Sequence, residues 1–152
     1  MKGSTIKKGI SVVVIAVIAL ILCACSNADK QVVDFAMLPQ SAQTFVKTHF
    51  ADKQVAIVYY DNDIFDKDYE LYFNDGARID FESNGEWKEL EDKVNGLPMT
   101  ALPAGISQYV AERHPGMPVV SIERKRHGFT VELSSEIEIK FNRGGQFLTY
   151  DD

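Results

Sequence analysis

The side chains best suited to bind a metal ion lie in DNDIFDKD, residues 61–68, the most acidic run of the chain. Calcium prefers oxygen ligands, and an EF-hand loop supplies them at positions 1, 3 and 5, with Gly at 6 and Glu at 12. Counted from Asp61, the sequence does not match this motif. Positions 5, 6 and 12 hold Phe65, Asp66 and Tyr72. We therefore expect a solvated hairpin loop, and weak, non-specific cation binding is the alternative.

The three histidines do not form a metal-binding pattern. They are His49, His114 and His127, and no two of them have a ligand spacing such as i, i+4. Ser, His and Asp all occur, but the sequence contains no nucleophile-elbow motif and no glycine-rich phosphate loop. We expect no metal site, no cofactor and no catalytic residues, and hence a protein that is not an enzyme.

Both cysteines lie at the end of a short apolar run near the N-terminus. Three lysines precede or adjoin residues 10–22, a run too short to span a bilayer comfortably, which ends in LCACS. These features are typical of a secretory signal peptide. Residues 22–25 also resemble a bacterial lipobox, in which the Cys after a small residue is lipidated. We expect residues 1–24 to be removed and Cys25 to become a lipid anchor in a membrane.

Other interpretations of this N-terminal segment stay open. An uncleaved membrane anchor needs about 20 apolar residues, more than the run provides. A plain secreted protein would share the signal peptide without the lipid. A metal or redox site at Cys23 and Cys25 would lose Cys23 on cleavage.

The charge of the mature chain excludes one class of partner. Removal of residues 1–24 takes away three of 16 basic residues and none of the 22 acidic ones, so the net charge falls from −6 to −9. Phosphate binding along a nucleic acid needs positive charge, so nucleic acid is not an expected partner. About 128 residues remain, enough for one domain. Residues 25–37 show no clear period, and we expect them to form a tether.

The rest of the chain repeats itself. Shifted by 64 positions, LPQSAQTFV (38–46) aligns with LPAGISQYV (102–110), and a gap of four residues then changes the offset to 60. A unit of about 55 residues is marginal as an independent domain. We therefore expect repeats 38–92 and 102–152, with linker 93–101, to form a single domain (38–152) around one core.

Each repeat begins with a helical period and continues with an alternating one. The residues of the first helical face are Ala42, Phe45, Val46 and His49. From Tyr69 onwards apolar and polar residues alternate, as in half-buried antiparallel strands, with turns at 74–76 and 83–85. With 55–60 as a first strand, each repeat reads αββββ. The expected fold class is α+β, with both helices packed on one face of a curved antiparallel sheet.

The second repeat differs from the first in two loops. Ser-Ser-Glu (134–136) replaces Asn-Asp-Gly (74–76), so no residue there adopts positive φ cheaply. We expect strain of about 1 kcal/mol or a different loop. RKRHG (124–128) is basic where the first repeat has its acidic run, so the two repeats carry opposite charge at equivalent places.

The repeated blocks resemble a known family. LPQSAQTFVKTHF and YELYFNDGARIDFESNGEW, with their echoes LPAGISQYVAERHPG and FTVELSSEIEIKFNRGGQF, are similar to the PepSY-like family of bacterial envelope lipoproteins. That family is similar in fold to the β-lactamase inhibitory protein. The resemblance covers 38–152 and implies a location in the bacterial cell envelope, in the periplasm or on the outer-membrane surface. It implies a binding or inhibitory role and no known catalytic residues.

The two repeats also differ on the outward face of the expected sheet. If Val58 points inward, Tyr59 and Tyr72 point outward, whereas their counterparts in the second repeat are Glu123 and Glu132. Exposed aromatic side chains flanked by charges are typical of protein-binding surfaces. The predicted protein-binding face comprises Ile57, Tyr59, Glu70, Tyr72, Arg78, Asp80 and Lys88. The alternative is a first strand that is covered on both sides or has the opposite parity.

These observations lead to one expected function and two alternatives. We expect a lipid-anchored extracytoplasmic module that binds a protein partner, as an inhibitor or regulator of a secreted or envelope enzyme. The first alternative is an envelope lipoprotein that binds a small molecule, a peptide or an ion. The second is a structural component of the envelope.

Overall fold

A computed structural model of the protein describes residues 30–62 and 67–151. The expected signal peptide, Cys25, residues 25–29 of the expected tether and the centre of the acidic loop at 63–66 lie outside the described residues. In the part of the chain that is described, no helix has the length and apolar character needed to cross a membrane.

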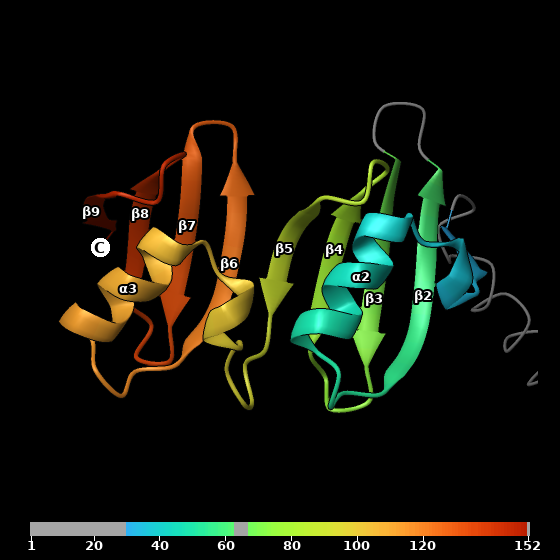
Figure 1. The fold of residues 1–152 in the computed structure, drawn as a ribbon, viewed down its shortest axis with the longest axis horizontal. Coiled ribbons are helices and arrows are strands. Elements are labelled where there is room, and N and C mark those ends of the chain that lie inside the picture. Colours follow the sequence, from blue (N-terminus) through green and yellow to red (C-terminus); the bar gives the residue numbers. More distant parts are fainter. Residues whose placement is uncertain (1–29, 63–66, 152) are drawn as a thin grey trace, which may run out of the picture. The chain divides into compact units, whose positions relative to one another are not determined.

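The described residues form an α+β fold with one nine-stranded sheet and two α-helices (Figure 1). The strands follow chain order from β1 to β9, and β2 to β9 pair antiparallel. The elements are β1 (Lys30–Val33), η2 (Phe35–Met37), α2 (Gln40–His49), β2 (Val55–Asn62), β3 (Lys67–Phe73), β4 (Arg78–Glu82), β5 (Trp87–Glu91), η3 (Met99–Ala101), α3 (Ala104–Arg113), β6 (Val119–Lys125), β7 (Gly128–Leu133), β8 (Glu138–Asn142) and β9 (Phe147–Asp151).

Both helices have the same construction. Each begins directly after a proline, Pro39 or Pro103, and runs for ten residues. Each ends where a backbone N–H returns to a valine carbonyl, from Phe50 to Val46 at 2.9 Å and from His114 to Val110 at 2.8 Å. The first helix thus ends just before Phe50 and the second just before His114.

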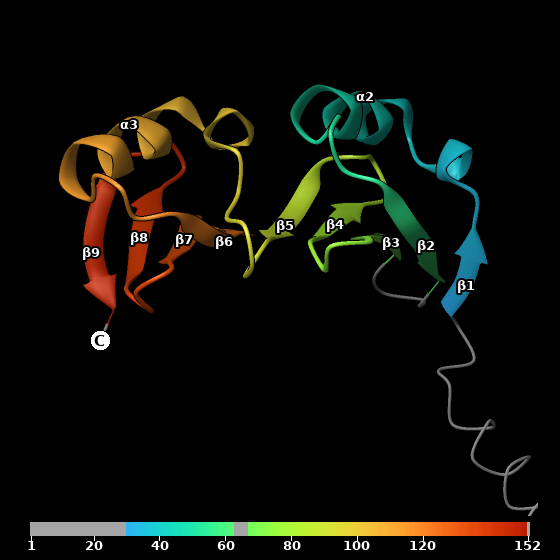
Figure 2. The same cartoon turned by 90° about the horizontal axis from the view of Figure 1, so that it is seen from below.

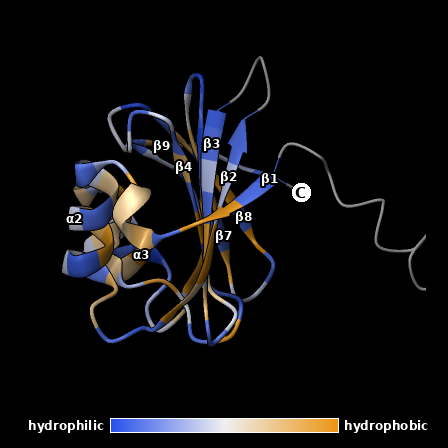
Figure 3. Ribbon diagram, turned by 90° about the vertical axis from the view of Figure 1, so that its right-hand side faces the viewer, coloured by the Kyte–Doolittle hydropathy of each residue, from blue (hydrophilic) through white to orange (hydrophobic). Residues whose placement is uncertain are grey.

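One apolar core lies between the helices and the sheet. Ala42 of α2 and Ile106 of α3 are fully buried and belong to one cluster with sheet residues such as Leu71 and Val131. Figure 2 shows α2 and α3 on the same side of strands β2 to β9. Figure 3, which views the fold from one side, shows hydrophobic and hydrophilic segments along both the helices and the strands. The pairing of β5 with β6 makes the sheet continuous between the two halves.

The structure corrects the expected tether. Lys30–Val33 forms β1 at the edge of the sheet, and Phe35–Met37 forms a 3-10 turn capped by Asp34, which accepts a hydrogen bond from the Ala36 N–H at 2.8 Å. Val33 and Phe35 also pack against the core. A four-residue strand is too short to show a period, and the unpaired edge of a sheet accepts a neighbouring strand with little regard to its sequence.

The turn at 134–136 is strained at one residue. Among the described residues other than glycine, Glu136 alone has a positive φ, 65°, and Gly76 takes φ 91° at the corresponding place in the first half. Both turns close with the same hydrogen bond, from Phe73 N to Ala77 O at 2.9 Å and from Leu133 N to Ile137 O at 3.0 Å. The two turns thus have the same backbone geometry, and in the second turn a residue with a side chain, Glu136, adopts the strained positive φ.

Glu136→Gly is therefore expected to stabilise the protein by roughly 0.5–1 kcal/mol, because glycine adopts this φ without strain. Chemical denaturation at neutral pH measures the change. Ser135→Gly is the control, and it should destabilise slightly because it adds only chain entropy to the unfolded state. A Glu136→Gly protein no more stable than the parent would contradict the assignment of strain to this residue.

A candidate binding surface on the outer sheet face

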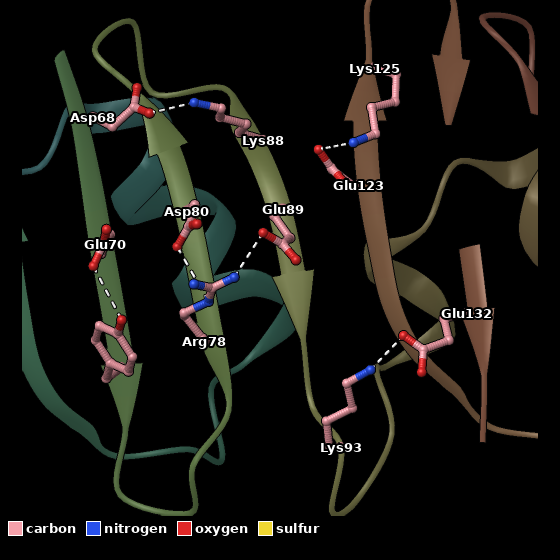
Figure 4. Close-up of polar contacts among 11 residues, drawn as sticks. Asp68, Glu70, Arg78, Asp80, Lys88, Glu89, Lys93, Glu123, Lys125 and Glu132 are labelled. Atoms are coloured by element: carbon pink, nitrogen blue, oxygen red, sulfur yellow. Dashed lines mark hydrogen bonds and ion pairs between the residues drawn. The ribbon is translucent and has the colours of Figure 1, made fainter. Parts of the chain in front are cut away.

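The outer face of the sheet is the face opposite α2 and α3. Val58 and Leu71 are buried toward the helices, being 2 % and 0 % exposed, and so the neighbouring Tyr59 and Tyr72 lie on the outer face. All seven residues of the predicted protein-binding face are half-buried there. Figure 4 shows four of them, Glu70, Arg78, Asp80 and Lys88, on strands β3 to β5.

Tyr59 and Tyr72 form an aromatic pair on this face. Their ring centroids lie 6.0 Å apart with an interplanar angle of 85°. The Tyr72 hydroxyl donates a hydrogen bond to Glu70 Oε2 at 3.1 Å. Burial, together with the nearby Glu70 charge, raises the pKa of Tyr72, so this hydroxyl stays protonated at neutral pH. Ile57 pairs directly with Tyr72 across the strands and extends the apolar part of the surface.

A row of four carboxylates crosses the outer face beside this aromatic pair. Strand register places Glu70 opposite Asp80, Asp80 opposite Glu89, and Glu89 opposite Glu123. We call these four residues the carboxylate row; they come one each from β3, β4, β5 and β6. Neighbouring strands are about 4.8 Å apart, and like charges directly opposite each other destabilise a sheet.

Several cations partly neutralise the carboxylate row. Arg78 binds Glu89 through Nη2 at 2.7 Å and lies 3.6 Å from Asp80 through Nε. Lys125 pairs with Glu123 at the far end. Beside the row, Lys88 binds Asp68 at 2.6 Å (Figure 4). Asp80, in the middle of the row, therefore shares a single arginine, Arg78, with its neighbour Glu89.

The arrangement disfavours the charged form of the Asp80 carboxyl group. Burial raises its pKa to about 6, Arg78 opposes the rise, and Glu89 and Glu70 add to it. Its Oδ1 atom is buried and has no hydrogen-bond partner within residues 30–62 and 67–151. At neutral pH the fold thus holds a desolvated carboxylate between two others, an arrangement that costs stability.

The carboxylates of the outer face do not form a metal site by themselves. Among the side chains that the structure describes, no three His, Cys, Asp or Glu residues gather closely enough to hold an ion. The row is extended, with one carboxylate per strand, whereas calcium needs six to eight oxygen ligands around one point. The surface is thus better suited to a partner that presents several cations in a line.

Sequence reasoning missed half of the carboxylate row. Glu70 and Asp80 were part of the predicted face, but Glu89 and Glu123 were not. Their alternation with Leu90 and Ile122 already indicated that they point outward. The missing information was the pairing of β5 with β6, which places Glu89 directly opposite Glu123.

Comparison with known proteins places the chain in a family. The family model described as "Putative beta-lactamase-inhibitor-like, PepSY-like" matches residues 25–71 and 67–149. The chain belongs to this family. The PepSY-like membership expected from the repeated blocks is thereby confirmed. Among curated proteins, no match was found.

Two solved structures from Bacteroides resemble this PepSY-like chain over most of its length. A protein of Bacteroides thetaiotaomicron, described as a "putative calcium-regulated periplasmic protein", is 33% identical with a TM-score of 0.77, over 82% of this chain and 98% of its own. A "putative periplasmic protein" of Bacteroides vulgatus is 36% identical with a TM-score of 0.76, over 84% of this chain and 100% of its own. Both descriptions support an extracytoplasmic location for this chain.

Proposed function

We propose that this PepSY-like protein is a lipid-anchored extracytoplasmic module whose outer sheet face binds another protein. The observation that carries the proposal is the carboxylate row, which the fold keeps although like charges across strands are unfavourable. A surface that costs stability and serves no packing purpose is best explained by a ligand that it binds. A secreted or envelope enzyme that is inhibited or regulated by this contact would be such a partner.

The chemistry of the face indicates what the partner presents. Tyr59, Tyr72 and Ile57 offer apolar area with little loss of side-chain entropy on binding. The adjacent carboxylate row favours Lys or Arg side chains, which would relieve the repulsion around Asp80 and orient the encounter. We therefore expect the partner to place a basic stripe along the row and an apolar residue against the tyrosine pair.

Two further parts of the proposal rest on the sequence. Lipidation of Cys25 would hold the module at a membrane, and a tether made of residues 25–29 would then separate lipid from fold. We also propose that the halves 38–92 and 102–152 arose by duplication, each with a helix on the same face of its four strands. In that case the two halves diverged after duplication at Tyr59 and Tyr72, where the second half has Glu123 and Glu132.

The double variant Tyr59→Ala/Tyr72→Ala is expected to reduce partner retention at least about tenfold, because two central aromatic contacts are removed together. Crosslinking pull-downs from native envelopes, quantified for each retained protein, measure this. Thermal stability should fall only slightly, since cross-strand aromatic pairs contribute at most about 1 kcal/mol.

Tyr60→Ala is the matched control for the tyrosine pair. Tyr60 adjoins Tyr59 in the chain, but its ring centroid lies 4.9 Å from that of Tyr69. Tyr69 packs against the core side of the sheet. Retention of the same proteins by both Tyr60→Ala and the double variant would argue against the outer face. An equal loss of retained proteins in Tyr60→Ala and in the double variant would indicate a damaged fold instead.

Ion-dependent binding is the second candidate function. It is favoured by one observation, the description of the B. thetaiotaomicron relative as a "putative calcium-regulated periplasmic protein". In residues 30–62 and 67–151 of this chain, no cluster of ligands supports it. A cation bridging the outer carboxylates and a partner would reconcile that description with the extended row.

A further inference from the structure

A basic pocket lies between two turns of the second half. It has a volume of about 430 Å³, and its lining includes Arg124, Lys125, Arg126, Arg143, Phe129 and Glu82. Arg124 and Lys125 end β6, Arg126 lies in the β6–β7 turn, and Arg143 lies in the β8–β9 turn. Four cations and one carboxylate thus surround a cavity in a chain whose net charge is −6.

Arg143 is held in place without an acidic partner. Its Nε and Nη2 atoms donate hydrogen bonds to the Arg126 carbonyl oxygen at 2.9 and 2.6 Å. Within the described part of the chain, no Asp or Glu forms an ion pair with Arg143 or with Arg126. The backbone therefore fixes one edge of a guanidinium that pairs with no acidic side chain among residues 30–62 and 67–151.

Arg124 is held in place by an aromatic ring. Its guanidinium lies 4.5 Å from the centroid of Trp87, and Trp87 contacts Phe129 at 5.9 Å. Nη1 donates to Glu86 at 2.8 Å, but Nε is buried and has no hydrogen-bond partner among the described residues. A stacked arginine is pre-organised, so little side-chain entropy is lost when it binds a further acceptor.

We propose that this pocket binds a phosphate group, carried either by a small soluble ligand or by a lipid headgroup. The planar fork of an arginine matches the oxygens of phosphate and forms strong charge-assisted hydrogen bonds. A phosphate dianion would balance the charges of Arg126 and Arg143, for which the described residues supply no acidic partner. Phe129 provides an apolar wall for the rest of the ligand, and Glu82 disfavours anions that fill the whole cavity.

This site takes the opposite ligand charge from the outer face and shares one residue with it, Lys125, which pairs with Glu123 of the carboxylate row. The test uses the full-length protein in detergent and two probes, inorganic pyrophosphate and a short-chain, water-soluble phosphatidic acid, whose headgroup is a phosphomonoester. Isothermal titration gives the dissociation constants. Arg126→Gln should weaken binding at least about tenfold through loss of a charge-assisted contact, and Arg126→Lys should fall between it and the parent.

Arg113→Gln is the matched control. Arg113 is exposed at the end of α3 and does not line the pocket, so Arg113→Gln removes the same charge elsewhere on the protein. Binding of pyrophosphate alone supports a soluble ligand, and binding of the lipid alone supports a headgroup. Equal weakening by Arg113→Gln and Arg126→Gln would overturn the proposal in favour of overall charge. So would the absence of binding of either probe at millimolar concentration.

Discussion

Asp92→Ala is expected to lower the free energy of unfolding by about 3 kcal/mol, because it breaks a buried ion pair by removing one partner. Asp92 is 0 % exposed, and its carboxylate binds Lys53 Nζ at 2.8 Å. Its other oxygen accepts the backbone N–H groups of Val94 and Asn95 at 3.1 and 2.8 Å. Alanine would leave these donors and the ammonium of Lys53, whose side chain is 11 % exposed, without that acceptor.

The loss caused by Asp92→Ala should depend on pH. Burial alone would raise the pKa of Asp92, but hydrogen bonds from the Asn95 N–H and from Lys53 bring it below the usual value. Stabilisation by a carboxylate of lowered pKa is fully present above the unfolded value of about 3.9 and is lost as pH falls through the folded value. The difference between parent and variant should therefore be full at neutral pH and shrink in strong acid.

Urea denaturation of the parent and Asp92→Ala, at neutral pH and in strong acid, measures this dependence. Asp52→Ala is the control, since Asp52 is exposed and close in the chain to Lys53; it should change stability by less than about 0.5 kcal/mol. A loss below about 1 kcal/mol for Asp92→Ala at neutral pH would mean that Lys53 is sufficiently satisfied by Asp75 alone.

Asp80→Asn is expected to have the opposite effect and to stabilise the protein by about 2 kcal/mol at pH 7.5. The physical reason is the pKa of about 6, raised chiefly by burial, which means that the folded state disfavours the charged carboxylate. Asparagine keeps the shape and removes the charge. Arg78 keeps its partner Glu89 at 2.7 Å, so no cation is left unpaired.

The sign of the pH effect follows from proton binding. Between about pH 4 and pH 6 the folded protein holds a proton on Asp80 that the unfolded chain has released. Wild-type stability contributed by this residue should therefore rise as pH falls from 7.5 to 5, and Asp80→Asn should lack that rise. Denaturation curves across this range measure both. Glu112→Gln, on the exposed side of α3, is the charge-matched control.

A destabilised Asp80→Asn protein would show that the contact with Arg78 outweighs the repulsion within the carboxylate row. An Asp80→Asn protein that is more stable but retains its partner less well would show that the charged Asp80 lowers stability and is needed for binding. These two readouts, stability and retention, separate a structural role of Asp80 from a binding role.

Much of the fold is encoded in local sequence patterns. The helical period predicted both helices, and in the structure each begins directly after a proline, at 39 or 103. With Val58 pointing inward, the alternation predicted that Tyr59 and Tyr72 lie on the outer face, as the structure has it. These predictions succeed because burial of one face of each element dictates where apolar residues recur.

Other features had no local signal. β1 is too short for a period to be recognised. The bonds that join Lys53 to Asp75 and Asp92 link segments 22 and 39 residues apart. The carboxylate row needs the β5–β6 pairing, and the basic pocket needs two turns brought side by side. Long-range register decides these sites, and it is set by the whole sheet rather than by neighbouring residues.

The central claim, that the outer face binds a protein, is tested most directly by site-specific photocrosslinking in native envelopes. A photoreactive amino acid is placed at Tyr59 and, as controls, at Thr44 and Gln108 on the exposed sides of α2 and α3. We expect one discrete crosslinked species from Tyr59 and none from the helix positions, with loss of the Tyr59 species when Asp80 and Glu89 are neutralised. The same species from all three positions, or none from Tyr59, would contradict the account.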